Sequence, residues 1–381
     1  MVLLLGALCF LSLLAVAHSY LLYPALLLRA AARRCRGIPA PAPVAEWPEV
    51  HVLMAVHNEE TVLPQKLQSL TSLDYPGQLS VHIVSDRSTD GTDRLLRGFA
   101  GPGRYITFND RRLGKPASIN RLAVGLPRSG VFVFTDASVI LRADTVRELV
   151  RPLAADGRLG VTDAVMLHTG VPEAGVGRLE DAYIRREVAL KRAASCLYAA
   201  LPGPFGGCWA LRAAAFRPVP DTFLVDDFYL CLAAYEQGYG GTTAGEAYAE
   251  EGVGLRLRDE FRRKRRIGAG NWQNLVRFRG LWWPPGRDAR AYVLFSHKIL
   301  RWLSPYLLLV GALSGLAVIA CLSNYRTAAA FLGIGLVACG LHPALRYFTA
   351  MNVALLIGGV DYLTGIKSNV WQPSHRNQDL E

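Results

Sequence analysis

A short apolar strand that ends in a carboxylate constrains this chain more than any other feature. Val131–Thr135 is a run of apolar and β-branched residues, and Asp136 follows it directly. Two similar runs, 50–56 and 79–85, precede it, and segments with helical spacing alternate with all three. This alternation predicts an α/β fold with a parallel-rich sheet and helices on both faces. Ligands bind beyond the carboxyl ends of strands in such sheets, so Asp136 is expected at a binding site.

The expected elements follow one another along the globular part of the chain. Strands are expected at 50–56, 79–85, 105–108 and 131–135. Helices are expected at 60–72, 91–98, 116–124, 143–155, 177–198 and 226–237. Beyond residue 160 the alternation is lost, and 203–209 is expected to be a glycine-rich loop.

Both ends of the chain are apolar enough to enter a membrane. Residues 1–28, 303–322 and 328–345 contain no Lys, Arg, Asp or Glu. A helix needs about 20 apolar residues to cross the hydrocarbon core, so these three runs are expected to be transmembrane helices. A fourth run, 349–360, is shorter, and we expect it to be re-entrant or interfacial.

The distribution of basic residues predicts the orientation in the membrane. Arg29, Arg33, Arg34 and Arg36 follow the first apolar run, which places residues 29–300 on the cytoplasmic side. The absence of a basic start and of a small-residue cleavage pattern favours a retained anchor over a cleaved signal peptide. We therefore expect a multi-pass protein of the inner (plasma) membrane with a cytoplasmic catalytic domain.

The net charge of +11 is concentrated in front of the C-terminal apolar runs. Thirteen Lys and Arg residues lie between Arg256 and Arg301, where three acidic residues oppose them. Segments 259–278 and 288–302 are basic and amphipathic, so they are expected to lie along the membrane surface. Such a surface can bind anionic lipid head groups or a diphosphate. The apolar segments and the lack of a recognisable nucleic-acid-binding motif argue against a nucleic-acid partner.

These observations predict a division of the chain into six parts. They are an N-terminal transmembrane helix (1–28), a basic and Pro/Ala-rich linker (29–48), a catalytic domain (49–255), basic interface helices (256–302), a C-terminal transmembrane region (303–365) and a tail (366–381). The seven cysteines show no metal-binding spacing and are expected to be reduced, buried thiols.

Polar residues follow the first two strands directly. His57, Asn58 and Glu59 stand at a strand-to-helix corner, where short polar side chains can bind a ribose or base. Asp86 directly follows the next expected strand, 79–85, and could accept a hydrogen bond from the imide N–H of a uracil ring. The alternative for these residues is helix capping, with acids in the first turn of the next helix.

Two further positions could bind a diphosphate and its cation. Lys115 stands at a helix start without the Walker spacing, and it could neutralise a diphosphate or be a solvated lysine. Asp136 and Ser138 could bind a divalent cation that phosphate and water oxygens complete. The alternative for Asp136 is a capping role.

The last candidates lie in two predicted helices. Asp227 could accept the proton of an attacking sugar hydroxyl, or it could simply begin a helix together with Asp226. Arg263 and Arg266 share one helix face and could bind a diphosphate leaving group, unless that face is only a basic membrane surface. Trp272 could stack on a sugar or lie at the membrane boundary.

Taken in order, these segments resemble the membrane-embedded family 2 glycosyltransferases, which include the cellulose and hyaluronan synthases. The matching segments are His57-Asn58-Glu59-Glu60, Val84-Ser85-Asp86, Gly114-Lys115-Pro116, Thr135-Asp136-Ala137-Ser138, Asp226-Asp227 and Arg263 to Gly270. Each segment is a weak signal alone, and their common order makes the resemblance specific.

The resemblance implies a GT-A (Rossmann-like) fold, an inverting mechanism, a UDP-sugar donor and Mg²⁺ or Mn²⁺. It assigns Asp86 to the uracil, Asp136 to the metal and diphosphate, and Asp227 to the general base. The segment Gly206-Gly207-Cys208-Trp209 is similar to the region that approaches the acceptor, which implies acceptor-binding roles for Gly207, Cys208 and Trp209. A C-terminal pattern at 371–376 is also similar.

Two departures from the family pattern bear on function. The usual Asp-x-Asp is Asp136-x-Ser138, so metal affinity is expected to be weaker or completed elsewhere. Processive synthases carry Gln-x-x-Arg-Trp, where this chain has Arg263-x-x-Arg266-Ile267. We therefore expect one sugar transfer onto a lipid-linked or membrane-proximal glycan acceptor.

Three alternatives remain open at this point. The first is a processive polysaccharide synthase, and the second is a non-catalytic membrane partner that still binds a nucleotide sugar. The third, a transporter, is disfavoured because Asp361 is the sole acidic candidate at the edge of the apolar runs.

Overall fold

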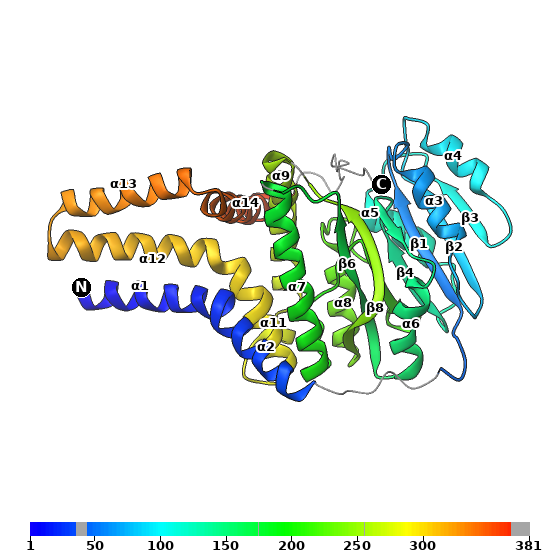
Figure 1. Ribbon diagram of the computed structural model, residues 1–381, viewed down its shortest axis with the longest axis horizontal. Coiled ribbons are helices and arrows are strands. Elements are labelled where there is room, and N and C mark those ends of the chain that lie inside the picture. Colours follow the sequence, from blue (N-terminus) through cyan, green and yellow to red (C-terminus); the bar gives the residue numbers. More distant parts are fainter. Residues whose placement is uncertain (36–43, 174, 255, 367–381) are drawn as a thin grey trace.

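An eight-stranded mixed sheet forms the core of the globular part of the protein (Figure 1). The structure is a computed structural model, and it describes residues 1–35, 44–173, 175–254 and 256–366. The strand order is β3-β2-β1-β4-β7-β6-β8-β5. The strands are β1 (Val50–Val56), β2 (Leu79–Ser85), β3 (Arg104–Phe108), β4 (Val131–Thr135), β5 (Val139–Leu141), β6 (Leu159–Thr169), β7 (Cys208–Arg212) and β8 (Gly240–Gly252).

The four predicted strands are confirmed as the parallel half of this sheet. Strands β3, β2, β1 and β4 pair side by side in parallel. The other half was not predicted: β7 runs antiparallel to β4 and β6, and β8 pairs with β6 and β5. The predicted loop at 203–209 is wrong in its last two residues, which begin β7.

Helices cover both faces of the sheet, as the alternation predicts. In β1, Val52 and Met54 belong to one core while Leu53 and Ala55 belong to the other, so both faces of the strand are buried. The first core is covered by α3 (Leu63–Thr71), α4 (Thr92–Phe99) and α6 (Thr145–Ala155). The second is covered by α5 (Lys115–Ala123) and α8 (Asp226–Glu236).

Three helices of the described chain are long and apolar enough to cross a membrane: residues 2–34, 289–322 and 343–364. The first joins α1 (Val2–Ala17), the π-helical turn His18–Leu22 and α2 (Tyr23–Arg34). The second joins α11 (Ala289–Leu294), the π-helical turn Phe295–Ile299 and α12 (Leu300–Leu322). One helix continues through residue 302, so the expected division there between an interface segment and a membrane segment lies within a single helix and stays a prediction. Helices α1, α12 and α13 (Tyr325–Leu341) lie side by side and project away from the sheet (Figure 1).

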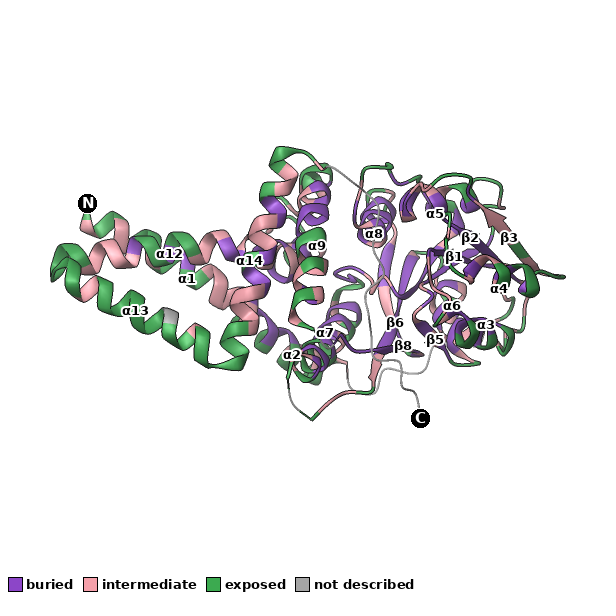
Figure 2. Ribbon diagram, turned by 90° about the horizontal axis from the view of Figure 1, so that it is seen from above, coloured by how far each residue is buried: buried purple, intermediate pink, exposed green. Residues whose placement is uncertain are grey.

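The last two helices differ in length from the expectation. Helix α13 has 17 residues, whereas α14 (Pro343–Thr364) has 22 and contains the run that we expected to be too short. Helix α14 runs across the direction of α12 and lies against α9 (Leu257–Arg277), as Figures 1 and 2 show. This direction fits an interfacial position, which stays a prediction.

The contact between α9 and α14 is close and includes an ion pair. The Cα of Gly358 approaches the backbone of α9 so closely that a Cβ would overlap the carbonyl of Arg265. Asp361 forms a bidentate pair with Arg265, with N–O distances of 2.6 and 2.7 Å. The one acidic residue considered for a transport path therefore joins two helices.

A disulfide joins the N-terminal helix to the catalytic domain. Cys35 follows α2, and Cys196 lies near the end of α7 (Val176–Tyr198), 161 residues later. The expectation that all cysteines are reduced is wrong for this pair, because sequence spacing does not reveal a pairing over that distance. The pattern at 371–376 and residues 36–43 of the predicted linker lie outside the described residues.

Candidate active site

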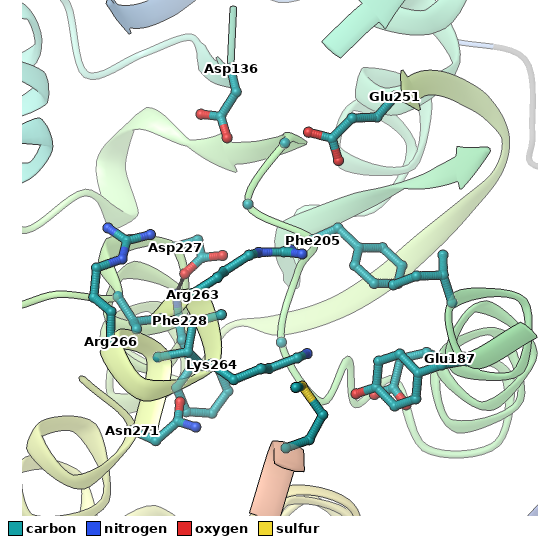
Figure 3. A pocket seen from close by; sticks show the side chains of 18 of the residues that line it. Asp136, Glu187, Phe205, Asp227, Phe228, Glu251, Arg263, Lys264, Arg266 and Asn271 are labelled. Atoms are coloured by element: carbon teal, nitrogen blue, oxygen red, sulfur yellow. Dashed lines mark hydrogen bonds between the residues drawn. The ribbon is translucent and has the colours of Figure 1, made fainter. Parts of the chain in front are cut away.

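A cavity of about 1160 Å³ lies between the carboxyl end of the parallel strands and helices α9 and α14 (Figure 3). Nine of the predicted site residues line it: Asn58, Glu59, Lys115, Asp136, Ser138, Gly207, Asp227, Arg263 and Arg266. Five do not: His57, Asp86, Cys208, Trp209 and Trp272. The sheet therefore brings most of the candidate groups together, although they come from segments far apart in the chain.

Asp136 lies at the end of β4 and faces the cavity. Its side chain is 37% exposed, and its Oδ1 accepts a hydrogen bond from Lys115 Nζ at 2.6 Å. Burial disfavours the charged form of Lys115, but the nearby carboxylates of Asp136 and Asp226 raise its pKa. Lys115 is therefore an ion-paired cation in the cavity rather than a solvated lysine.

A buried lysine holds the turn that carries Asp136. Lys66 of α3 donates to Thr135 Oγ1 at 2.7 Å and to the carbonyl of Val139 at 2.5 Å. Burial lowers the pKa of Lys66 to about 7. Sequence analysis missed Lys66, because a lysine in a helix is usually exposed and the sequence does not show that this one is buried.

Glu251 is a second carboxylate beside Asp136, and sequence analysis missed it too. Strand β5 pairs with β8 so that Val139 lies opposite Glu251. Ser138 Oγ donates to Glu251 Oε1 at 3.0 Å, and Glu251 lines the same cavity. Figure 3 shows both carboxylates directed toward the same part of the cavity. Position 138 is a serine and not an acid, but Glu251, near the end of the unpredicted strand β8, supplies a carboxylate next to it.

Asp227 lies in the first turn of α8, close to the loop 203–207. A Cβ on Gly206 would lie 2.6 Å from Asp227 Oδ2, so a larger residue there would displace this carboxylate. Burial and the neighbouring charge of Asp226 raise the pKa of Asp227 to about 6, against the opposing effect of Lys115. A carboxylate with this pKa suits general base catalysis near neutral pH.

The two arginines of α9 differ in their partners. Arg263 donates to Glu180 at 2.9 Å and to Glu260 at 3.4 Å, so its charge is largely balanced. Arg266 forms no ion pair with any residue that the structure describes, and it lines the cavity near Asp227 (Figure 3). Arg266 is therefore the better candidate for binding a diphosphate, and the role of Arg263 stays a prediction.

Asp86 and His57 lie behind the cavity. The fully buried carboxylate of Asp86 accepts hydrogen bonds from Asn109 Nδ2, Leu113 N and Gly114 N at 2.7 to 2.9 Å. His57 Nδ1 lies 2.9 Å from the carbonyl oxygen of Asp86. In this conformation Asp86 holds the loop that leads to Lys115, and a contact with a base would require that loop to move.

Three predicted acceptor-binding residues have structural positions instead. Cys208 and Trp209 are buried in β7, where Trp209 stacks on Phe134 with ring centroids 4.3 Å apart. Trp272 lies where α9, α12 and α14 meet, and its Nε1 donates to Tyr306 at 3.2 Å. None of the three lines the cavity in this conformation, so their acceptor-binding roles stay predictions.

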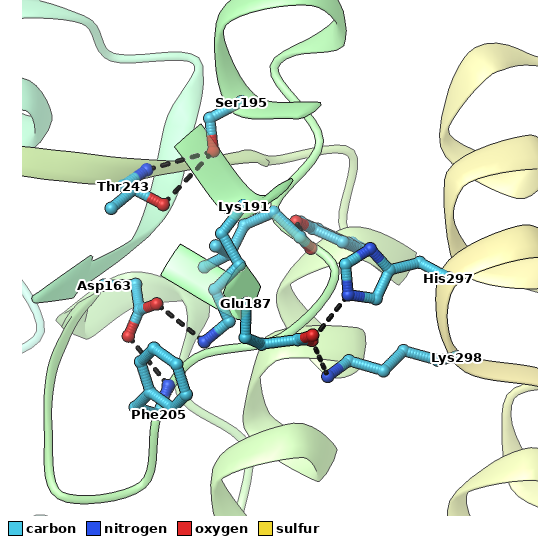
Figure 4. A network of polar contacts seen from close by, with 10 residues as sticks. Asp163, Glu187, Lys191, Ser195, Phe205, Thr243, His297 and Lys298 are labelled. Carbon is cyan, nitrogen blue, oxygen red and sulfur yellow. Dashed lines mark hydrogen bonds and ion pairs between the residues drawn. The ribbon is translucent and has the colours of Figure 1, made fainter. Parts of the chain in front are cut away.

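A buried polar network supports the loop 203–207 from the other side (Figure 4). Asp163 pairs with Lys191 at 2.8 Å and accepts from Phe205 N at 2.7 Å. Farther along α7, Glu187 accepts from His297, Lys298 and Arg301 at 2.5 to 3.1 Å. The network therefore joins the catalytic domain to the helix that continues into α12.

The cavity residues fit a hard divalent cation only in part. Among the described residues, no three His, Cys, Asp or Glu side chains are grouped to hold a metal ion. Asp136 and Glu251 offer two oxygen ligands beside open cavity space, which suits Mg²⁺ or Mn²⁺ when substrate oxygens and water complete the coordination.

Comparisons with known proteins identify the family and the fold. Residues 51–219 match the model of the family described as glycosyl transferase family 2. An N-acetylglucosaminyltransferase from Bradyrhizobium sp. (strain ANU 289) is 33% identical over 129 residues, which cover 32% of this chain and 80% of that protein. The chain belongs to glycosyltransferase family 2. This family 2 enzyme also matches a beta-monoglucosyldiacylglycerol synthase from Synechocystis sp. at 32% identity over 131 residues, 32% of this chain and 27% of the synthase.

A solved structure shows the same fold over almost the whole chain. It is a mannosyltransferase from Pyrobaculum calidifontis in complex with GDP-mannose and Mn²⁺, with a TM-score of 0.72 and 24% identity. The match covers 93% of this chain and 99% of that chain. The predicted GT-A fold of this glycosyltransferase is thereby confirmed.

Proposed function

We propose that this glycosyltransferase moves a sugar from a nucleoside-diphosphate sugar to a hydroxyl group of a lipid or lipid-linked acceptor at the membrane, with inversion of the anomeric carbon. One observation carries the proposal: Asp136, Asp227 and Arg266 line a single cavity that continues to the long apolar helices. Such a transfer requires a carboxylate to accept the proton and a cation to balance the charge on the diphosphate. For a lipid acceptor, it also requires an apolar surface beside these groups.

The roles of the residues follow from their positions. Asp227 accepts the proton of the acceptor hydroxyl while the oxygen of that hydroxyl attacks the anomeric carbon. The bond between the anomeric carbon and the diphosphate breaks, and Arg266 and Lys115 balance the charge that develops on the diphosphate. A cation held by Asp136 and Glu251 would supply further neutralisation of the diphosphate oxygens.

The names of similar proteins support the donor and acceptor classes. The Pyrobaculum mannosyltransferase binds GDP-mannose and Mn²⁺, and the Synechocystis relative is a synthase of a glucosyldiacylglycerol. The sequence-based expectation of a UDP-sugar and of a cytoplasmic catalytic domain in the inner membrane stays part of the proposal.

The proposal is tested by nucleotide release from the purified full-length protein. A panel of UDP- and GDP-sugars is offered with membrane lipid extract, Mn²⁺ or Mg²⁺, and the released nucleoside diphosphate is measured. We expect release with at least one donor, and a loss of at least about a hundredfold in Asp136→Ala and Asp227→Asn. Glu46→Ala, at an exposed position outside the cavity, is the control. Undiminished turnover by the first two variants would overturn the proposal.

A further inference from the structure

The cavity exceeds the usual volume of a small-molecule site, and the side farthest from the sheet is lined by the long apolar helices. Ligand sites commonly measure about 300–1,000 Å³, whereas this cavity measures about 1160 Å³. Its lining runs from Asp136 at the sheet to Leu355 of α14 and Tyr20 of the first long helix. There is therefore room for an acceptor that extends from Asp227 toward the bilayer.

The cavity wall farthest from the sheet comes from one face of α14 and is mostly apolar, with Asn352 as its polar residue. Ala344, Tyr347, Phe348, Met351 and Leu355 line the cavity, and their spacing of three or four residues places them on one helix face. Because the same helix is apolar enough to enter a membrane, this wall suits a hydrocarbon chain.

Basic side chains lie between this wall and the catalytic residues. Lys298 and Arg301 share one carboxylate, that of Glu187, at 3.1 and 2.7 Å. Lys264 forms no ion pair with a described residue, and its Nζ lies 5.1 Å from the ring centroid of Tyr183. Figure 3 shows its amino group directed into the cavity, on the side where Glu187 lies. Cations therefore exceed carboxylates in the middle of the cavity, where an anionic group of a ligand would be stabilised.

We propose that the acceptor carries a phosphate or diphosphate between its hydroxyl-bearing head and its lipid tail, and that Lys264, together with Arg301, binds this phosphate. The inference rests on the proposed function and specifies its acceptor. The order of the cavity lining matches the order of such a molecule: Asp227 at the hydroxyl, cations at the phosphate and α14 at the tail. The phosphate is an anchor and is not consumed, because the bond that forms joins the acceptor oxygen to the anomeric carbon.

The test compares acceptors that differ in this phosphate. The full-length protein in phosphatidylcholine vesicles is offered an isoprenyl-diphosphate-linked sugar, phosphatidylinositol, or the neutral lipid monoglucosyldiacylglycerol. We expect kcat/KM for at least one phosphate-bearing acceptor to exceed that for the neutral lipid by about tenfold or more. The first two acceptors distinguish an isoprenoid source of the phosphate from a glycerophospholipid source.

Variants of α9 assign the effect to Lys264. We expect Lys264→Gln to raise KM for the phosphate-bearing acceptor about tenfold, whereas Lys264→Arg should retain activity. The control is Arg258→Gln, which is exposed on the same helix and outside the cavity, and its KM should be unchanged. Donor hydrolysis without acceptor should be the same in all of them. Equal use of the neutral lipid, or an unchanged KM in Lys264→Gln, would overturn the inference while donor hydrolysis still upheld the proposed function. Absence of both hydrolysis and transfer would instead overturn the proposed function.

Discussion

The hydroxyl of Ser138 donates a hydrogen bond to the carboxylate of Glu251, with an Oγ–Oε1 distance of 3.0 Å. Position 138 is where the family pattern has a second acid, and the pairing of Val139 with Glu251 supplies one from another strand. The structure therefore places a carboxylate from β8 within hydrogen-bond distance of the side chain at position 138.

This relationship predicts that Glu251 contributes to metal dependence. We expect Glu251→Gln to raise the Mn²⁺ or Mg²⁺ concentration for half-maximal turnover by about tenfold or more, because an amide binds a hard cation more weakly than a carboxylate. Titration of metal into the nucleotide-release assay measures the change. Glu246→Gln, exposed on the same strand, is the control. An unchanged metal requirement in Glu251→Gln would show that Glu251 does not bind the cation.

The raised pKa of Asp227 predicts an acid limb in the pH profile. The carboxylate must be ionised to accept a proton, so transfer should fall as the pH decreases through about 6. Asp226→Asn removes a like charge beside Asp227, and we expect it to move this limb to lower pH. The measurement is kcat as a function of pH for both proteins. A limb that stays in place in Asp226→Asn would argue against this electrostatic coupling.

The buried pair of Asp163 and Lys191 predicts a strong effect on stability. Lys191→Met leaves a buried carboxylate without its cation, which typically costs about 3–5 kcal/mol of unfolding free energy. We expect a marked decrease in the thermal midpoint of the detergent-solubilised protein. The double variant Asp163→Asn/Lys191→Met should be less damaged, because no unpaired charge remains. The opposite order would mean that packing, and not charge, dominates at this position.

The close contact of α9 and α14 predicts sensitivity at Gly358. A methyl group there would overlap the backbone of Arg265, so we expect Gly358→Ala to destabilise the contact by about 1–3 kcal/mol. The variant should also lose transfer to lipid acceptors more than donor hydrolysis, because α14 lines only the membrane side of the cavity. Gly333→Ala in α13, where nothing lies within 4 Å of the added Cβ, is the matched control. Equal effects of the two substitutions would contradict this account of the contact.

Sequence reasoning predicted the parts of the fold whose residues carry a local signal. Apolar runs such as Val131–Thr135 end in polar residues and predict parallel strands directly. Strand β8 (Gly240–Gly252) was missed because its glycines, alanines and glutamates have low strand propensity. Its strand conformation depends on pairing with the distant strand β6. The length of α14 was underestimated because Arg346 and Asp361 interrupt its apolar pattern.

The site was predictable where a motif places a side chain beyond a strand end. Asp136, which follows β4, is such a residue. Asp227 and Arg266 were predicted from motifs on helices α8 and α9, and all three line one cavity. Glu251 and Lys66 were missed because their roles depend on pairing between distant segments, which a single sequence does not encode locally. Trp272 carried a motif signal, but its ring packs against Tyr306 and Tyr362.

The most direct test of the central claim is mass spectrometry of the lipid fraction after incubation with a nucleotide sugar. The native protein should convert one lipid species into a product heavier by a single sugar residue, and Asp227→Asn should form no such product while it still binds the donor. A product of many added sugars would contradict single transfer, and an equal amount of product with Asp227→Asn would contradict the assignment of the general base.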